Sequence, residues 1–95
     1  MATPESKVKA LVTKILRELN AYYFFAAANG YGRSGIPDIV CCYKGHFIGI
    51  ECKAGKNKPT ALQERELKLI HEAGGYSLLI NEENIDDVRK LLETL

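Results

Sequence analysis

Three residues that could do chemistry together stand at the two ends of one apolar segment. Asp38 opens this segment, and Glu51 and Lys53 close it, within residues 35–55. Two carboxylates and an ammonium do not stabilise an apolar β-hairpin, so their position needs another explanation. A pair of carboxylates either keeps one acid protonated for acid–base catalysis or binds a cation between its members. Both interpretations require that the fold bring the side chains to one place.

The expected hairpin register predicts that the three side chains do meet. A two-residue turn at Lys44-Gly45 pairs residues whose numbers sum to 89, which places Asp38 directly opposite Glu51. Because side chains alternate along a strand, Lys53 lies on the same face, two residues beyond Glu51. A longer turn would change the pairing. Each residue alone is explained by solvation at the end of a strand, and only the shared position favours a catalytic role.

Facing carboxylates favour a bound divalent cation. Like charges directly opposite each other destabilise a pair of strands, and a cation between them removes the repulsion. Mg²⁺ is bound in proteins by one or two carboxylates, together with waters and phosphate oxygens of the substrate. Such an ion activates water and stabilises the charge on a phosphodiester, while Lys53 would assist the water or neutralise a phosphate oxygen. The backbone carbonyl of Cys52 is placed to add a ligand.

The elements that hold these residues follow from the remaining pattern. Thr3 and Pro4 begin a helix with apolar residues at helical spacing, and Thr60 caps a second helix that stops at Gly74-Gly75. We expect helices over 4–20, 61–73 and 84–94, and strands over 22–27, 37–43, 46–53 and 76–80. The order αβββαβα predicts one α/β domain over residues 1–95, with a four-stranded mixed sheet flanked by helices.

Composition indicates an ordinary globular domain. The longest uncharged apolar run in the 95 residues, Ala21–Ala28, is well short of the ~18 residues that suggest a membrane span. The first residues lack a basic start followed by an apolar stretch, so we expect a cytoplasmic protein without a membrane partner. Cys41, Cys42 and Cys52 contain no CxxC pair, and we expect all three to be small buried residues rather than metal ligands.

Charge is nearly balanced overall but differs between the two parts of the chain. Residues 1–58 contain nine lysines or arginines and four acids, whereas residues 59–95 contain four and eight. Residues 1–58, which include the candidate site, therefore have a net positive charge. This charge is compatible with a surface that faces nucleic-acid phosphates. Solvated loop residues are the alternative. The residues that we expect to contact DNA are Arg33, Lys56, Lys58 and, by stacking on a base, Tyr31.

The residues around the candidate site resemble a known nuclease family. Pro37-Asp38, followed after twelve residues by Glu51-Cys52-Lys53, matches the PD-(D/E)XK signature of a large nuclease superfamily. Over essentially the whole chain, the surroundings resemble the stand-alone phage and bacterial form of the virus-type replication-repair nuclease (VRR-NUC) domain. This resemblance implies a restriction-endonuclease-like fold. The segments that carry this resemblance are Gly35–Ile39, Ile50–Lys53, Thr60 with Gln63, and Gly74-Gly75 before an apolar strand.

The resemblance implies a phosphodiesterase that acts on DNA with Mg²⁺ or Mn²⁺ and needs no small-molecule cofactor. Small stand-alone members are similar to Holliday-junction resolvases that work as homodimers. Asp38 and Glu51 would be metal ligands, Lys53 the catalytic lysine, and Gln63 a supporting residue on the following helix. Glu5 would match an acid of the first helix, and its alternative role is to complement the helix dipole.

Two other functions stay open at this point. A flap- or nick-specific nuclease working with a partner protein would use the same residues, and a non-catalytic nucleic-acid-binding module would share the fold. The intact Asp38, Glu51 and Lys53 argue against the binding module. No segment identifies a dimer interface, and we assign the apolar Tyr22–Phe25 to the core, with an interface as the alternative. Glu66 lies on the same side of its predicted helix as apolar residues, and we expect it at the boundary of the core.

Overall fold

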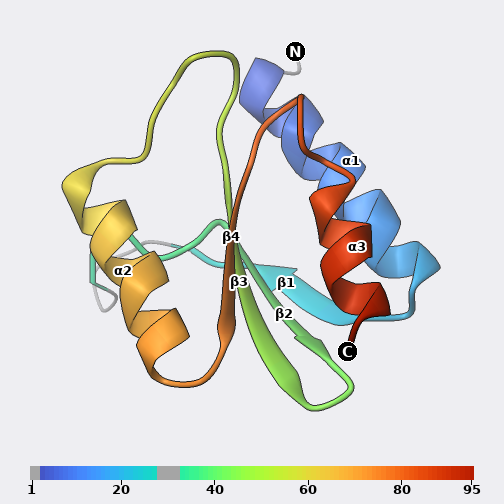
Figure 1. The fold of residues 1–95 in the computed structure, drawn as a ribbon. Helices are drawn as coiled ribbons and strands as arrows, with labels where there is room; N and C mark the ends of the chain where they lie inside the picture. Colours follow the sequence, from blue (N-terminus) through green and yellow to red (C-terminus); the bar gives the residue numbers. More distant parts are fainter. Residues whose placement is uncertain (1–2, 28–32) are drawn as a thin grey trace.

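The elements of the computed structural model, which describes residues 3–27 and 33–95, follow the predicted order αβββαβα (Figure 1). They are α1 (Pro4–Glu18), β1 (Tyr22–Phe25), β2 (Ile39–Tyr43), β3 (His46–Cys52), α2 (Ala61–Glu72), β4 (Tyr76–Ile80) and α3 (Asp87–Glu93). The predicted α/β class and four-stranded mixed sheet are confirmed. Within the two described ranges, no helix is both long enough and apolar enough to cross a membrane.

The strands form one sheet in the order β1-β2-β3-β4. The first three strands are antiparallel neighbours, and β4 runs parallel to β3 after a crossover through α2. The β2–β3 hairpin has the predicted register, in which Ile39 pairs with Ile50. Lys44 and Gly45 both have positive φ, 49° and 83°, as a type I′ two-residue turn requires. The turn therefore fixes which residues reach the end of the hairpin.

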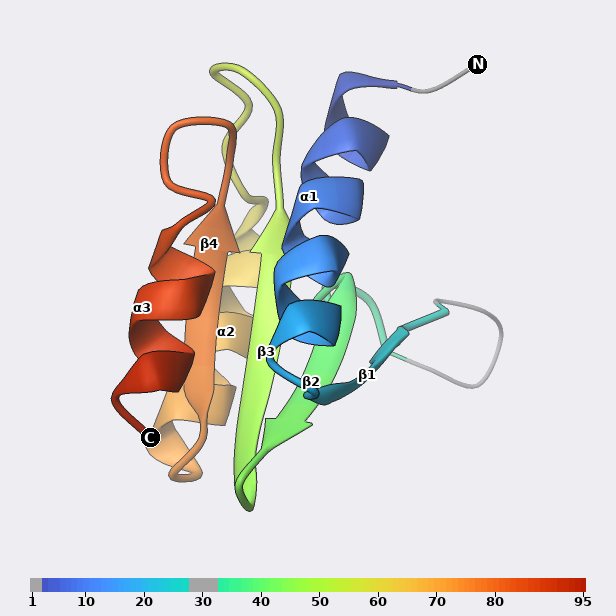
Figure 2. The ribbon, with the colours of Figure 1, turned by 90° about the vertical axis from the view of Figure 1, so that its right-hand side faces the viewer.

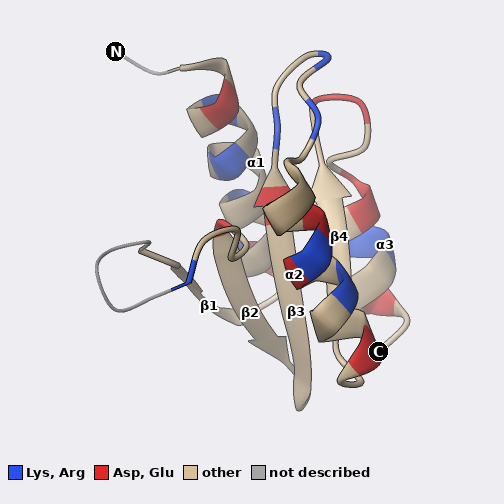
Figure 3. Ribbon diagram, turned by 90° about the vertical axis from the view of Figure 1, so that its left-hand side faces the viewer, with Lys and Arg blue, Asp and Glu red and all other residues tan. Residues whose placement is uncertain are grey.

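The helices cover the two faces of the sheet unequally. α1 and α3 lie together on one face, whereas α2 alone lies on the other, over β3 and β4 (Figures 1, 2 and 3). A fully buried aliphatic side chain contributes about 1.5–3 kcal/mol, so the layer between the sheet and α1 and α3 supplies most of the hydrophobic stabilisation. The residues of this core are Val8, Val12, Ile15, Leu16, Ile39, Cys41, Ile48, Ile50, Cys52, Ile80, Val88 and Leu92.

The first helix begins where the sequence predicted. Thr3 accepts a hydrogen bond at 3.1 Å from the backbone N–H of Ser6, and Pro4 occupies the first helical turn. The helix ends at Glu18 rather than at residue 20, because Asn20 adopts a left-handed φ of 60°. Its buried apolar stripe fixes the rotation of α1 on the sheet and so determines which of its polar residues face the hairpin end.

Other elements are also shorter than predicted. β2 begins at Ile39 rather than at residue 37, and β3 and α2 each end one residue earlier than predicted, at Cys52 and Glu72. The last helix begins at Asp87 rather than at residue 84, because the Asn84 side chain is used in a turn. It accepts a hydrogen bond from the N–H of Asn81 at 2.8 Å and donates to the carbonyl of Leu79 at 3.0 Å. The first strand ends at Phe25, two residues earlier than expected.

The first strand exposes aromatic side chains that we assigned to the core. Tyr22, Phe24 and Phe25 are 71%, 48% and 55% exposed. The assignment was wrong because β1 is an edge strand and α2 packs on β3 and β4 instead. Cys42, which pairs with Tyr22, is exposed rather than buried for the same reason, whereas the other two cysteines are buried as predicted.

Candidate metal centre

Three carboxylates meet at the end of β3, beside the first turn of α1. Asp38 lies directly before β2, Glu51 lies near the end of β3, and Glu5 lies in the first turn of α1. Each offers one carboxylate oxygen, and these three oxygens lie within 4.8 Å of one another. The structure therefore brings the two acids of the hairpin together with the acid of the first helix.

Asp38 is held in place by the backbone around it. Its Oδ2 accepts a hydrogen bond from the N–H of Cys52 at 2.9 Å, and its own carbonyl accepts one from the N–H of Ala26 at 2.9 Å. The other carboxylate oxygen, Oδ1, is 3.7 Å from Nζ of Lys9. Oδ2 thus fixes the side chain of Asp38, while Oδ1 faces the ammonium of Lys9. The ligand role of the Cys52 carbonyl stays a prediction.

Glu51 is the least satisfied acid of the site. It is 1% exposed, its Oε2 is 3.5 Å from Nζ of Lys53, and its Oε1 has no hydrogen-bond partner among the described residues. Burial, followed by the negative charge of Asp38, raises the pKa of Glu51 to about 7 against the opposing effect of Lys53. A buried, unpartnered carboxylate oxygen is costly, and carboxylates are the ligands that Mg²⁺ and Mn²⁺ prefer. The residues present therefore fit a divalent ion.

Two lysines border the three carboxylates. Lys53 has a side chain that is 15% exposed and directed at Glu51. Lys9, which our reading of the sequence missed, lies one helical turn after Glu5, with its Nζ 3.9 Å from Glu5 Oε1 and 3.7 Å from Asp38 Oδ1. The (i, i+4) spacing from Glu5 was visible in the sequence. The approach of Lys9 to Asp38 was not visible in the sequence, because it depends on how α1 is rotated on the sheet.

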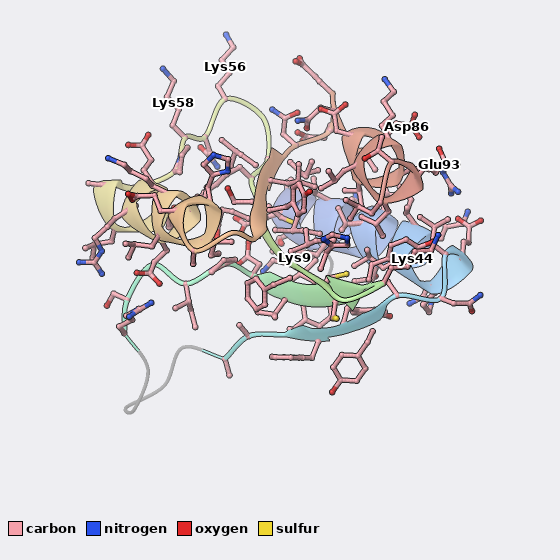
Figure 4. All side chains as sticks on the ribbon, turned by 60° about the horizontal axis from the view of Figure 1, so that its bottom comes forward. Lys9, Lys44, Lys56, Lys58, Asp86 and Glu93 are labelled. Atoms are coloured by element: carbon pink, nitrogen blue, oxygen red, sulfur yellow. The ribbon has the colours of Figure 1, made fainter. Side chains whose placement is uncertain are left out.

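A cleft of about 570 Å³ lies beside Glu5, and Gly55, Lys56 and Glu82 are among its other lining residues. The N–H of Gly55 donates to both carboxylate oxygens of Glu82, at 2.9 and 3.1 Å, which holds the connector between β3 and α2. Lys56 and Lys58 extend outward from this connector (Figure 4). Their location permits contact with a polyanion, and the contact with phosphate stays a prediction.

Gln63 has no hydrogen bond to the three carboxylates within the described part of the chain. Gln63 forms a capping box: its side-chain oxygen accepts from the N–H of Thr60 at 2.8 Å, and its own N–H donates to Thr60 Oγ1 at 3.2 Å. This arrangement gives Gln63 a structural role, and its supporting role in catalysis stays a prediction. Tyr31 lies outside the described residues.

The loop before Asp38 contacts α2 through an ion pair and a close backbone approach. Arg33 Nε donates to Glu66 Oε1 at 2.9 Å, and Arg65 approaches the other oxygen of Glu66 at 3.5 Å. Glu66 is 3% exposed, so it is a buried residue of α2 rather than a boundary residue. Gly35 has φ +88°, and a Cβ there would lie 2.6 Å from the carbonyl carbon and oxygen of Leu62. Arg33, predicted to contact phosphate, thus has a carboxylate partner, although its side chain is largely exposed.

The chain is similar to a phage protein and to two solved structures. "Putative nuclease p44" of Acyrthosiphon pisum secondary endosymbiont phage 1 is 29% identical over 85 residues, and the match covers 88% of each chain. A structure described as "VRR_NUC domain" has a TM-score of 0.76 and 24% identity and covers 97% of both chains. Another, "VRR_NUC domain protein", has a TM-score of 0.69 and 18% identity, over 98% of this chain and 88% of its own. No family model matches the chain.

Proposed function

We propose that this protein, which has the VRR-NUC fold that its sequence predicted, is a metal-dependent endonuclease that hydrolyses phosphodiester bonds of DNA. The observation that carries the proposal is the buried oxygen of Glu51 that has no hydrogen-bond partner among the described residues, on a carboxylate that meets those of Glu5 and Asp38. Such an atom is stabilised by a cation. The nuclease description of the phage relative supports the same class of activity.

The residues of the site divide into metal ligands and a catalytic lysine. Glu5, Asp38 and Glu51 would hold Mg²⁺ or Mn²⁺, with the carbonyl of Cys52 as a further ligand. The bound ion would supply an activated water and stabilise the charge that develops on the phosphodiester. Lys53, beside Glu51, is suited to orient the attacking water or to neutralise a phosphate oxygen. The residues proposed to bind DNA or support the site are Arg33, Lys56, Lys58, Tyr31 and Gln63.

A four-way DNA junction is the substrate that we propose, and a homodimer is the form that would cut it. The described residues contain one cluster of three carboxylates, so one chain would cut one strand. Two symmetrical cuts need two sites related by a two-fold axis, as an isologous dimer provides. A nuclease that cuts flaps or nicks with the help of a partner is the alternative, because it needs only one site.

An exposed aromatic surface, made of Tyr22, Phe24 and Phe47, supports the dimer. Tyr22 pairs with Cys42, and Cys42 pairs with Phe47, so these side chains share one face of the sheet. The rings of Tyr22 and Phe24 lie edge to face, with centroids 6.3 Å apart. Val40 and Cys42, which lie between the aromatic residues on β2, carry no charge. DNA binding depends on Lys and Arg contacts to phosphate, so this surface favours a protein partner.

The size of the aromatic surface suits the centre of a dimer interface. Its three residues are 71%, 48% and 47% exposed. An aromatic side chain buries about 150–250 Å² in full, so together they offer roughly 250–400 Å². A stable interface buries about 800 Å² per partner around such aromatic anchors. A second copy of this chain would therefore cover the aromatic surface and its surroundings.

Cleavage of labelled DNA tests the catalytic part of the proposal. Wild type, Asp38→Asn and Lys53→Met are incubated with a four-way junction, a flap, a nicked duplex and a linear duplex, each with Mg²⁺, Mn²⁺ or EDTA. We expect paired, symmetrical cuts in the junction that need the metal and vanish in both variants. Cuts confined to flaps or nicks would keep the nuclease and overturn the junction. Binding without cleavage by wild type would favour the non-catalytic module.

Sedimentation tests the dimer independently of cleavage. We expect wild type to sediment as a dimer and a Tyr22→Ser/Phe24→Ser double variant as a folded monomer. Leu79→Ser is the matched control, because Leu79 is 42% exposed on β4, the opposite edge strand. Cys42 adds a natural reporter, since it is the exposed cysteine of the same face: its reaction with a thiol reagent should slow as wild type becomes more concentrated. A wild type that stays monomeric would overturn the dimer.

A further inference from the structure

Lys9 occupies an unusual position for a helix lysine. Its Nζ lies between two acids of the metal centre, 3.9 Å from Glu5 Oε1 and 3.7 Å from Asp38 Oδ1. Its side chain is 31% exposed, so most of it is withdrawn from water. Figure 4 labels Lys9 within the body of the molecule, whereas Lys56 and Lys58 extend away from it.

Lys9 competes with a divalent ion for the same negative charge. The carboxylates that it faces are two of the three that would hold the ion. Two cations within a few ångströms repel each other, and a divalent ion doubles the repulsion that a single charge would produce. The ammonium is a point charge on a flexible chain of four carbons, so it can move away without disturbing the helix. An ion that binds here therefore has to displace the ammonium.

We propose that Lys9 is the built-in counter-ion of the metal-free site, and that metal binding releases it toward a phosphate of the DNA. The inference rests on the proposed function. It adds a residue that couples the binding of the metal ion to the binding of DNA. In the metal-free protein, the ammonium reduces the repulsion between Glu5 and Asp38. In the metal-loaded protein, the ion takes over that role, and the ammonium is free to pair with a phosphate beside the site. Metal binding and DNA binding then strengthen each other through Lys9.

A simpler interpretation of Lys9 is an ordinary (i, i+4) ion pair with Glu5 on the helix surface. Such pairs add a few tenths of a kcal/mol to a helix and have no link to metal binding. The contact with Asp38, which lies 29 positions further along the chain, distinguishes the two interpretations. A surface pair does not need it, and a counter-ion of the metal centre does.

Metal affinity of the DNA-free protein tests the first half of the proposal. Mn²⁺ binding is measured by calorimetry for wild type, Lys9→Met, Lys9→Arg and Lys7→Met. Lys7 is exposed on the same helix and forms no ion pair within the described part of the chain, so Lys7→Met makes the same change in net charge away from the site. We expect Lys9→Met to bind Mn²⁺ about 3- to 30-fold more tightly, allowing for solvent screening, and Lys9→Arg to resemble wild type.

The outcomes separate this role from the metal centre itself. Equal Mn²⁺ affinity in Lys9→Met and Lys7→Met would overturn the counter-ion role and leave the metal centre intact. Weaker Mn²⁺ binding in Lys9→Met would also overturn it, because Lys9 would then support the site rather than compete. If wild type binds no Mn²⁺, the metal centre of the proposed function fails, and the role of Lys9 fails with it. Circular dichroism of each variant, with Lys9→Gln as a second neutral substitution, checks that the fold is retained.

DNA affinity tests the second half. Junction binding is measured with Ca²⁺ and with EDTA, in a Lys53→Met background that keeps the DNA intact. We expect Ca²⁺ to increase the DNA affinity of the Lys9-containing protein several-fold more than that of the Lys9→Met protein, because only the former releases an ammonium. The Lys7→Met control should retain the full increase. An equal increase with and without Lys9 would overturn the release of Lys9 to DNA.

Discussion

Two buried glutamates of this protein have opposite surroundings. Glu66 on α2 is 3% exposed, and its two carboxylate oxygens have arginine partners, Arg33 at 2.9 Å and Arg65 at 3.5 Å. Glu51 on β3 is 1% exposed, yet one of its oxygens has no partner among the described residues and the other is 3.5 Å from Lys53. The two acids are thus equally buried, but only one of them is satisfied by the protein.

The difference separates an acid that holds the structure together from one suited to bind a ligand. Glu66 ties the loop that precedes Asp38 to α2, and its own hydrogen bonds account for its burial. Glu51 lacks a comparable set of partners among the described residues, and its burial disfavours the charged form and raises its pKa to about 7. Burial of an acid therefore says little about its function, whereas a buried carboxylate oxygen without a partner needs an explanation, and a bound cation would supply one.

The largest expected effect comes from exchanging each glutamate for its neutral isostere. Glu51→Gln should reduce cleavage by about 100- to 1,000-fold, because it removes a proposed metal ligand. At pH 8 without metal, it should leave the free energy of unfolding unchanged or raise it, since burial and the charge of Asp38 disfavour the Glu51 carboxylate more than Lys53 favours it. Glu66→Gln should do the reverse: it should retain most of the activity and lower stability by about 1–2 kcal/mol.

Nuclease assays and urea unfolding of both variants check this crossover. A Glu51→Gln protein that is much less stable than wild type would mean that Glu51 is a structural acid like Glu66. A Glu66→Gln protein that is inactive but fully stable would place Glu66 in the catalytic site instead.

The loop that joins the two regions gives the next largest effect. Gly35→Ala should lower stability by about 2–4 kcal/mol and reduce activity, because its Cβ would meet the Leu62 backbone at 2.6 Å at an already positive φ. Gly45→Ala is the matched control: its φ is also positive, +83°, but its Cβ would meet nothing within 4 Å. The control should cost only about 1 kcal/mol and keep activity. Equal losses of stability would show that the loop does not depend on its contact with α2.

The pH dependence of metal binding sharpens the description of Glu51. Its pKa is raised from 4.5 to about 7 in the metal-free fold, so below pH 7 the ion must displace a proton. Mn²⁺ affinity should fall by up to about tenfold per pH unit below pH 7 and level off above it. The same shift should make the metal-free protein lose stability as pH rises from 4.5 to 7, because the folded state binds the proton more tightly. Calorimetry and urea unfolding across pH 5–8 measure both trends, and the stability trend should be absent in Glu51→Gln.

The parts of the site that follow local rules could be predicted from the sequence. The two-residue turn at Lys44-Gly45 set the register of the hairpin, and the register placed Asp38 near Glu51. The capping residues Thr3 and Thr60 likewise marked the starts of α1 and α2, because a cap, like a turn, depends only on residues close to it in the sequence.

The parts that we missed depend on how distant elements pack. Glu66 meets an arginine 33 residues away, and neither residue carries a local signal of the contact. Lys9 meets Asp38 only because the buried stripe of α1 turns it toward the sheet. Tyr22 and Phe24 have the residue types of a core strand, but the order of the strands places them at an edge. Sequence pattern indicates that a strand forms, and packing decides what covers it.

Gln63 carries the smallest expected effect and separates a structural role from a catalytic one on the same helix as Glu66. Its side chain closes a capping box with Thr60, so Gln63→Ala should lower stability by about 0.5–2 kcal/mol through loss of the cap. Gln63→Glu keeps an acceptor for the N–H of Thr60 and should leave stability within about 0.5 kcal/mol of wild type. A stable Gln63→Glu protein that cleaves DNA poorly would give Gln63 a function beyond the cap, because the cap itself would be intact. Full activity in that variant would reduce the residue to its structural role and leave the lysine and the acids at the end of the hairpin to carry the chemistry.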